Sequence, residues 1–277
     1  MPLSVLPVSH GEVLVMQLSG LVDIVQNYDA MLIDQYGVLH DGHKLYPNIL
    51  DALAQLHKSD VPVVILTNSG KRAEYNIERL LRLGIPRSYF VNCMSSGELC
   101  YQTLSARKVK MIGRSGEDYG FTGVEDVDSV DDAEVVLILG SDAPRLTLDD
   151  YRTLLQPYVR KSIPAICCNP DLQMITKTGI EFAPGAIATL YQEMGGHVHW
   201  VGKPYADIYH AASALIGRPA RVLCIGDSPE HDIAGGQAAG FDTLLVMTGL
   251  SQGRDASQTH PAPNYIMESF RWTNSKN

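Results

Sequence analysis

The sequence predicts an α/β protein built on a parallel sheet that is buried on both faces. Several short apolar runs end abruptly at a polar cluster, and most of those clusters open a segment with helical periodicity. Continuous apolar strands that alternate with helices are typical of parallel sheets covered by helices. With 277 residues, of which 45% are hydrophobic and 19% charged, the chain has the composition of one large or two ordinary globular domains.

Four of the apolar runs carry polar residues at their carboxyl ends. The runs and their ends are 30–33 with Asp34, 61–66 with Thr67, Asn68 and Ser69, 197–201 with Lys203, and 221–225 with Asp227. Ligands bind at the carboxyl ends of the strands in open α/β sheets. We therefore expect these side chains to share one site.

Helical patterns follow three of these clusters. After Ser69 the apolar positions 73, 77, 80 and 81 recur at helical spacing, and Gly84 ends the pattern as a C-cap. Pro204 suits the first position of the next helix. The stretch 230–239 closes at Gly240, which is another C-cap signal.

The middle of the chain, from about residue 93 to 184, repeats the alternation. Residues 108–112, 134–139 and 163–168 are predicted strands, and the acidic stretch 113–132 is a predicted loop. We expect this part to form its own small α/β layer.

Composition excludes several classes of function. The chain has 22 Lys and Arg against 31 Asp and Glu, a net charge of −9, which argues against a nucleic-acid partner. Its apolar runs are too short to span a membrane, and the first eighteen residues hold no Lys or Arg, so we expect a cytoplasmic protein. Five cysteines without a CxxC pair predict reduced thiols, and the nine histidines show no zinc-binding spacing.

The polar strand ends predict a phosphate site with a metal ion. Asp34 and Asp227 would repel each other unless a cation lies between them, and hard oxygen ligands suit Mg²⁺. Free backbone N–H groups after Asn68 can bind an anion at a helix N-terminus, and Lys203 supplies a positive charge for phosphate.

Four motifs in this order resemble the motifs of the haloacid dehalogenase-like hydrolase superfamily. They are IDQYGVLHDG (33–42), LTNSG (66–70), VGKP (201–204) and GDSPEHDI (226–233). The form of the first two, the long insert after them, and CNPD (168–171) are similar to class IIA, the NagD-like sugar and nucleotide phosphatases. The resemblance implies a Rossmann-like core of residues 1–92 and 186–277 with an inserted α/β cap of residues 93–185. It also allows a homodimer.

The resemblance assigns a role to each matching residue. Asp34 is the expected nucleophile, which takes the phosphoryl group as an aspartyl-phosphate. The residues expected to bind substrate or phosphate are Thr67, Asn68, Ser69, Lys203, Asn169 and Asp171. Mg²⁺ is expected on Asp34, Asp227 and the backbone carbonyl of Tyr36, with Asp232 as a supporting acid.

Tyr36 departs from the family pattern, because phosphatases of the family have a second aspartate two residues after the nucleophile. That aspartate protonates the leaving group and later activates water. A tyrosine with a pKa near 10 can donate a proton but is a poor base, so we expect slow hydrolysis of the intermediate. His40, Asp41 and His43 are alternative acid–base groups in the same loop.

The predicted function is a Mg²⁺-dependent phosphatase that acts on a small phosphorylated metabolite, a sugar phosphate or a nucleotide. Two alternatives stay open. One is a catalytically impaired metabolite-binding protein that keeps the pocket, and the other is a phosphotransferase that passes the phosphoryl group to a second alcohol. Among relatives without the second aspartate, dehalogenases need no magnesium, whereas this chain keeps both Asp227 and Asp232.

Overall fold

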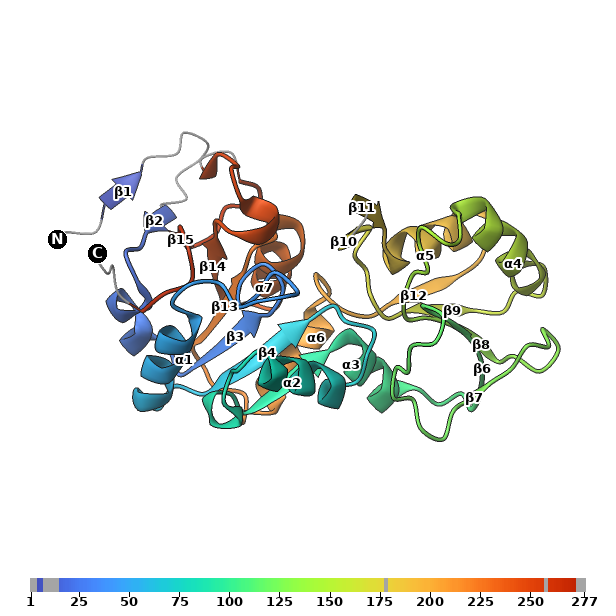
Figure 1. Cartoon of the computed structure of the whole chain (residues 1–277), viewed down its shortest axis with the longest axis horizontal. Helices are drawn as coiled ribbons and strands as arrows, with labels where there is room; N and C mark the ends of the chain where they lie inside the picture. The colour runs from blue at the N-terminus through green and yellow to red at the C-terminus, as the bar shows by residue number, and fades with distance from the viewer. Residues whose placement is uncertain (1–3, 7–14, 177–178, 257–258, 273–277) are drawn as a thin grey trace. The chain divides into compact units, whose positions relative to one another are not determined.

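The computed structural model describes residues 4–6, 15–176, 179–256 and 259–272 of the chain. The chain divides into two units, each with its own sheet (Figure 1). The first unit consists of Met1–Thr67, Ile77–Met94 and Lys203–Asn277, and the second of Asn68–Asn76 and Ser95–Gly202. Both segments of the second unit are therefore inserted into the first. The chain passes between the units after Thr67, Asn76, Met94 and Gly202.

The first unit is built on an eight-stranded sheet in the order β1-β2-β15-β14-β13-β3-β4-β5. Its strands are β1 Ser4–Leu6, β2 Val15–Gln17, β3 Ala30–Asp34, β4 Val63–Thr67, β5 Asn92–Ser95, β13 Val222–Gly226, β14 Asp242–Val246 and β15 Tyr265–Met267. The central strands pair in parallel, and β1 runs antiparallel to β2. This architecture confirms the predicted α/β fold class.

Complete burial of the central strands explains their continuous apolar sequences. Every residue of β3, β4 and β13 is buried, as expected for a parallel sheet covered on both faces. The helices of this unit are α1 Ile49–Lys58, α6 Ala206–Ala214 and α7 Ala234–Ala238, and α2 Ala73–Arg82 starts in the second unit and ends in the first. Helix α6 packs on β3 and β4, and α7 packs on α6 and β14.

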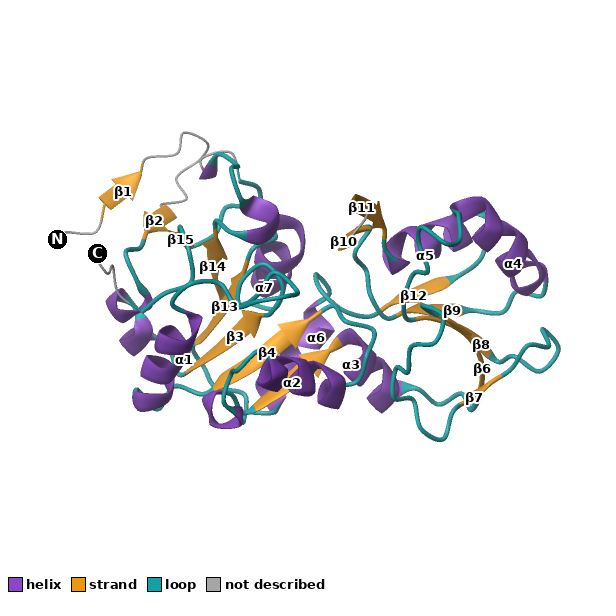
Figure 2. Ribbon diagram, viewed as in Figure 1, coloured by secondary structure: helices purple, strands orange, loops and turns teal. Residues whose placement is uncertain are grey.

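The second unit has a five-stranded parallel sheet in the order β12-β9-β8-β6-β7 (Figure 2). Its strands are β6 Lys108–Ile112, β7 Glu125–Asp126, β8 Val135–Ile138, β9 Ala165–Cys167 and β12 Val198–Trp200, with a separate hairpin of β10 Gln173–Thr176 and β11 Gly179–Phe182. The helices are α3 Ser96–Thr103, α4 Leu148–Arg160 and α5 Pro184–Glu193.

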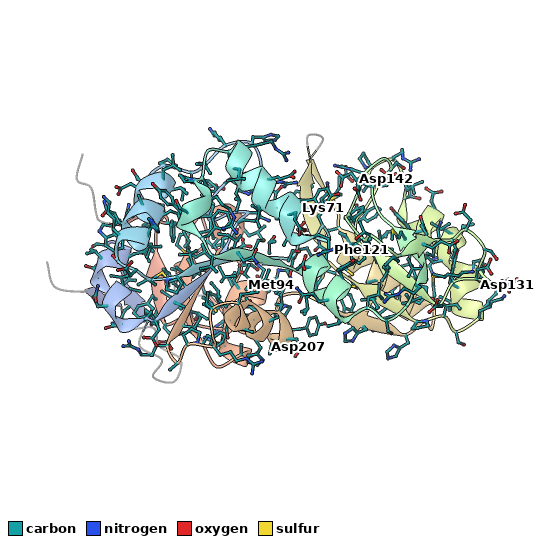
Figure 3. All side chains as sticks on the ribbon, turned by 90° about the horizontal axis from the view of Figure 1, so that it is seen from below. Lys71, Met94, Phe121, Asp131, Asp142 and Asp207 are labelled. Carbon is teal, nitrogen blue, oxygen red and sulfur yellow. The ribbon has the colours of Figure 1, made fainter. Side chains whose placement is uncertain are left out.

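Strand β8 shows how the sheet of the second unit is buried on both sides. Val136 and Ile138 point into the cluster that includes side chains of α4 and α5. Val135 and Leu137 point into a separate cluster with Phe121, which is labelled in Figure 3. Because successive strand residues face opposite sides, an unbroken apolar run is required here.

The position of β12 differs from the prediction. The run 197–201 was expected to end in the same sheet as the strands before Asp34 and Asp227, but β12 pairs in parallel with β9 of the second unit. The predicted boundary at 186 accordingly falls inside α5, and the second unit continues to Gly202. An apolar run indicates a buried strand and carries no information about which sheet the strand joins.

All five cysteines are buried, and none of them forms a disulfide. Among the residues that the structure describes, no helix has the length and apolar character needed to cross a membrane.

Candidate active site

Asp34 and Thr67 lie at the carboxyl ends of two neighbouring parallel strands. Asp34 ends β3 and pairs in register with Leu66, the residue before Thr67 at the end of β4. All other residues of the two strands are apolar, so Asp34 and Thr67 are the first polar residues along β3 and β4. Both are buried. The sheet itself therefore places the predicted nucleophile and the predicted phosphate-binding hydroxyl on one edge.

Asp227 follows β13, the strand on the other side of β3. Two glycines with positive φ enclose its carboxylate: a Cβ at Gly37 would lie 2.1 Å from Asp227 Oδ2, and one at Gly249 would lie 2.0 Å from the same atom. The Leu250 N–H also donates to Oδ2. Backbone from two separate loops thus packs against this carboxylate, and any larger residue at Gly37 or Gly249 would displace it.

Lys203 bridges two of the acidic side chains. Its Nζ lies 2.7 Å from Asp34 Oδ1 and 2.6 Å from Asp232 Oδ1, and all three residues are buried. Asp232 belongs to the π-helical turn Pro229–Ile233, and its Oδ2 accepts the Ser228 N–H at 3.0 Å. The expected supporting acid therefore acts on Lys203 and directs the ammonium group to Asp34.

Burial raises the pKa of Asp34 well above its ordinary value against the attraction of Lys203, and the nearby carboxylates of Asp232 and Asp227 add to the rise. Burial, with a contribution from Asp232, raises the pKa of Asp227 to about 7. Although burial opposes it, the charges of Asp232 and Asp34 raise the pKa of Lys203. One ammonium thus faces three carboxyl groups, and a further positive charge beside them would favour the ionised form of all three.

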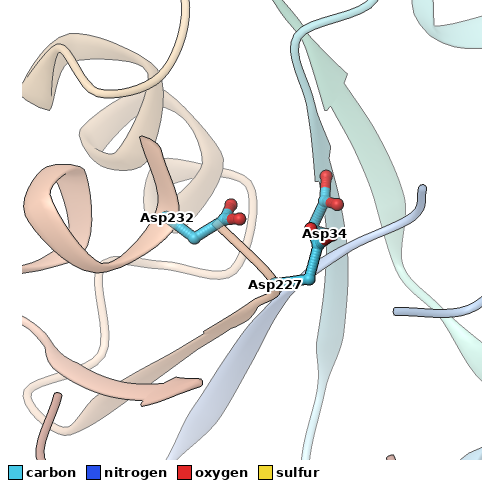
Figure 4. Close-up of side chains that lie close together, drawn as sticks. All are labelled: Asp34, Asp227 and Asp232. Atoms are coloured by element: carbon cyan, nitrogen blue, oxygen red, sulfur yellow. The ribbon is translucent and has the colours of Figure 1, made fainter. Parts of the chain in front are cut away.

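This donor set fits a divalent cation. Oxygens of Asp34, Asp227 and Asp232 lie within 4.8 Å of one another, and Figure 4 shows the three carboxylates converging. Buried carboxylates without compensation are costly, and carboxylate oxygens are ligands that Mg²⁺ prefers. Because Lys203 binds one oxygen each of Asp34 and Asp232, the second oxygen of Asp34 and the Asp227 carboxylate are the donors that suit a cation.

Tyr36 lies two residues beyond Asp34, and its side chain is 42% exposed. The His40 ring meets its ring edge-on at a centroid distance of 4.4 Å, and the Arg79 guanidinium carbon lies 5.2 Å from its centroid. A Cβ at Gly42 would be 3.2 Å from the Tyr36 ring. These neighbours anchor the ring, while much of the side chain remains accessible on the loop that carries Asp34.

The alternative acid–base groups in this loop have structural roles. His40 Nδ1 accepts the Gly42 N–H at 3.0 Å, and burial lowers the pKa of His40 to about 4, so its imidazole is neutral at neutral pH. Asp41 accepts the N–H groups of Lys44 and His43, and these bonds lower the pKa of Asp41. The His43 side chain is exposed on the same turn.

The second unit contains the remaining predicted residues and joins two of them. Asn68 Nδ2 donates to Asp171 Oδ1 at 2.8 Å, and Asn169 Oδ1 accepts the Asp171 N–H at 3.0 Å in an Asx turn. Ser69 Oγ accepts the Lys71 N–H at 3.3 Å. The sequence predicts that Asp171 binds substrate, and in the structure its carboxylate accepts a hydrogen bond from the Asn68 carboxamide.

Sequence reasoning missed four residues that shape these surroundings: Gly37, Gly249, Ser96 and Gly202. Gly37 and Gly202 lie within two of the predicted motifs, so a glycine at a motif position could have signalled a close approach of backbone and side chain. Gly249 and Ser96 lie far from their partners in the sequence, and nothing local identifies those partners.

Comparison with known families agrees with this geometry. Residues 31–150 match a family model described as haloacid dehalogenase-like hydrolase, and residues 200–273 match one described as HAD-hydrolase-like. Together the two ranges cover about 70% of the chain.

Curated relatives are similar over nearly the full length. The 5'-nucleotidase YutF of Bacillus subtilis is 25% identical over 258 residues, which cover 89% of this chain and 97% of the relative. The acid sugar phosphatase of Staphylococcus aureus is 25% identical over 247 residues, which cover 87% of this chain and 95% of the relative. A solved haloacid dehalogenase-like hydrolase from Brucella suis is 26% identical with a TM-score of 0.78, over 91% of this chain and 99% of that chain.

Proposed function

Since this chain belongs to the haloacid dehalogenase-like hydrolase superfamily, class IIA, and is a phosphoric monoester hydrolase, we propose that it is a Mg²⁺-dependent phosphatase of a small phosphorylated metabolite. The substrate class is a sugar phosphate or a nucleotide, in line with the names of the two curated relatives. The observation that carries the proposal is the Lys203 ammonium held between Asp34 and Asp232 beside Asp227.

Asp34 acts as the nucleophile. One of its carboxylate oxygens forms a bond to phosphorus while the bond to the leaving oxygen breaks, which gives an aspartyl-phosphate. Water then attacks phosphorus, and Asp34 leaves as a carboxylate together with inorganic phosphate. Lys203 reduces the repulsion between Asp34 and the phosphate oxygens, and Asp232 holds Lys203 in place.

Thr67 and Lys203 bind the transferring phosphate, and the backbone N–H groups of Asn68 and Ser69 add donors on the segment that follows β4. Asp34, Asp227 and the backbone carbonyl of Tyr36 would hold Mg²⁺. When bound, Mg²⁺ supplies the positive charge that neutralises the phosphate oxygens. The second unit serves as the cap that selects the leaving group.

Tyr36 stands at the position of the acid–base aspartate of the family. Its phenol donates a proton to the leaving oxygen but accepts one poorly from water, because an ordinary phenol has a pKa near 10. Since His40 and Asp41 hold the loop together, neither replaces the missing base. Hydrolysis of the aspartyl-phosphate is therefore the slow step.

Phosphate release from a panel of sugar phosphates and nucleotides tests the proposal. With Mg²⁺ present, Asp34→Asn should lose activity by at least roughly 10³-fold, because the nucleophile is removed. Tyr36→Asp should raise turnover by on the order of 10²-fold, because general acid–base assistance is restored. Denaturing gels of protein incubated with labelled substrate should show more phosphoenzyme in the wild type than in Tyr36→Asp.

Asp29→Asn is the matched control. Asp29 directly precedes the first residue of β3, at the end of the strand away from Asp34, and it forms an ion pair with Arg221. This variant should keep wild-type activity. Phosphate release that persists in Asp34→Asn would contradict the mechanism. Activity that appears only in Tyr36→Asp would favour a binding protein instead.

A further inference from the structure

Three residues of the second unit enclose the Asn68 carboxamide: Asp171, Ser96 and Gly202. We call these three residues the Asn68 clamp. Asp171 Oδ1 accepts from Asn68 Nδ2 at 2.8 Å, and Ser96 Oγ donates to Asn68 Oδ1 at 3.3 Å. A Cβ at Gly202 would lie 2.7 Å from Asn68 Oδ1 and 2.3 Å from Ser96 Oγ. Both ends of the carboxamide are therefore held, and Asn68 is 5% exposed.

The rest of the loop after Asn68 is tied to the start of α3. The Gly97 N–H donates to the Ser69 carbonyl at 3.0 Å, and Ser95 Oγ donates to the Lys71 carbonyl at 2.6 Å. The partly buried Arg72–Glu98 ion pair, at 2.6 Å, adds a further connection. The loop thus has a rigid support on the side of α3, and Asp171 holds the Asn68 amide from a more distant part of the chain.

Asp171 is itself held firmly. Its N–H donates to Asn169 Oδ1 at 3.0 Å, and its carbonyl accepts the Gly185 N–H at 2.9 Å at the start of α5. Because these two bonds fix the backbone of Asp171, its short side chain loses less entropy when the carboxylate accepts from Asn68, and the contact is partly preorganised.

We infer that Asp171 is a positioning residue, which fixes Asn68 and thereby the backbone that donates to the phosphate of the substrate. The inference rests on the proposed function, in which the segment at Asn68 binds the phosphate of the substrate. A carboxylate aimed at a bound phosphate would repel it, whereas a carboxylate that holds the Asn68 amide helps to organise the phosphate site. Gly202, which belongs to the clamp, directly precedes Lys203 in the chain.

The positioning role of Asp171 is tested by the affinity of the protein for inorganic phosphate, measured by calorimetry in the presence of Mg²⁺. Inorganic phosphate has no leaving group, so the measurement reports on the phosphate site alone. Asp171→Ala removes the acceptor and should weaken phosphate binding roughly tenfold, the size of one hydrogen bond to a charged group. Asp171→Asn keeps an acceptor oxygen and should restore binding to within about threefold of the wild type. Asp149→Ala, an exposed acid of α4 in the same unit, is the control and should bind phosphate normally.

A double-mutant cycle separates positioning from direct contact. Asn68→Ala should weaken phosphate binding about as much as Asp171→Ala, and the double variant should lose no more than either single one. In kcat/KM, Asp171→Ala should lose the same factor for every phosphomonoester, because the leaving group does not touch it. Circular dichroism melting checks that each variant is folded.

Losses that are additive in the cycle, that differ between leaving groups, or that are as large in Asp171→Asn as in Asp171→Ala would overturn the inference. So would a wild type that binds no phosphate. A wild type that binds phosphate through this clamp but releases none from any phosphomonoester would instead overturn the proposed function and leave the inference standing.

Discussion

Lys203 and His40 show how burial decides which single residues carry charge. Lys203 stays cationic because two carboxylates lie within hydrogen-bond distance of its Nζ. The His40 ring meets a backbone N–H, an amide oxygen and the Tyr36 ring, and burial outweighs the charge of Asp41 and lowers the pKa of His40 to about 4. The first residue is proposed to serve the chemistry, and the second holds the loop that carries Tyr36.

The pKa of His40 predicts an acid-sensitive loop. An unfolded histidine titrates near 6.5, so the neutral folded form contributes stability in full above that pH and loses it as the pH falls toward 4. The free energy of unfolding should fall by roughly 3 kcal/mol from this group over that window. Urea unfolding from pH 7 to pH 4 measures it, and His40→Gln should show a shallower slope. Equal slopes in both proteins would contradict the prediction.

At the scale of elements, the site depends on turns that bring backbone against side chains. The loop after β3 turns at Gly37 with φ +83°, and the carbonyl of Gly37 accepts the Thr248 hydroxyl from the loop after β14. Two loops that leave parallel strands thus join over Asp227. This packing explains why the carboxylate is buried although it lies at a sheet edge.

Gly37→Ala and Gly84→Ala separate backbone strain from this close approach. Both glycines have positive φ, so both substitutions should cost about 1–2 kcal/mol of stability. At Gly84, which ends α2, an added Cβ meets nothing within 4 Å, so activity should be unchanged. At Gly37 the added Cβ displaces Asp227, so phosphate release should fall at least roughly tenfold. Equal activity in the two variants would refute the proposed role of Gly37.

At the scale of the whole molecule, the net charge of the chain and the charge of the proposed substrate have the same sign. The chain carries a net charge of −9, yet its substrate is proposed to be an anion. Lys203 alone does not balance the three buried carboxylates of the site. A cation bound here would have two effects: it would compensate the buried charge of the three carboxylates, and it would make the local electrostatic potential more favourable for a phosphate anion.

Mg²⁺ should therefore stabilise the folded protein. After treatment with EDTA, added Mg²⁺ at about 100 times its Kd should raise the free energy of unfolding by about 2.7 kcal/mol. Asp227→Asn should lose this response, and Asp29→Asn should keep it. Thermal unfolding with and without Mg²⁺ measures the effect. A wild type that melts at the same temperature in EDTA and in Mg²⁺ would argue against a metal site at these residues.

Much of the fold and of the site could be predicted from local patterns. The apolar runs before Asp34, Thr67 and Asp227 became β3, β4 and β13 nearly residue for residue, because a strand buried on both faces must be apolar throughout. Since parallel strands end at one edge, the meeting of Asp34 and Asp227 also followed. The capping glycine after α2 was visible as well.

The sequence by itself thus determined the α/β class, the buried strands and the polar residues that end them, since these depend on neighbours a few residues away. Only the tertiary structure decided that β12 joins the sheet of the second unit, that Asp232 acts on Lys203, and that Asp171 holds Asn68. Each of these is a pairing between distant segments. A hydrogen-bond donor or a strand edge has many chemically equivalent partners in the sequence, and packing of the whole chain selects one.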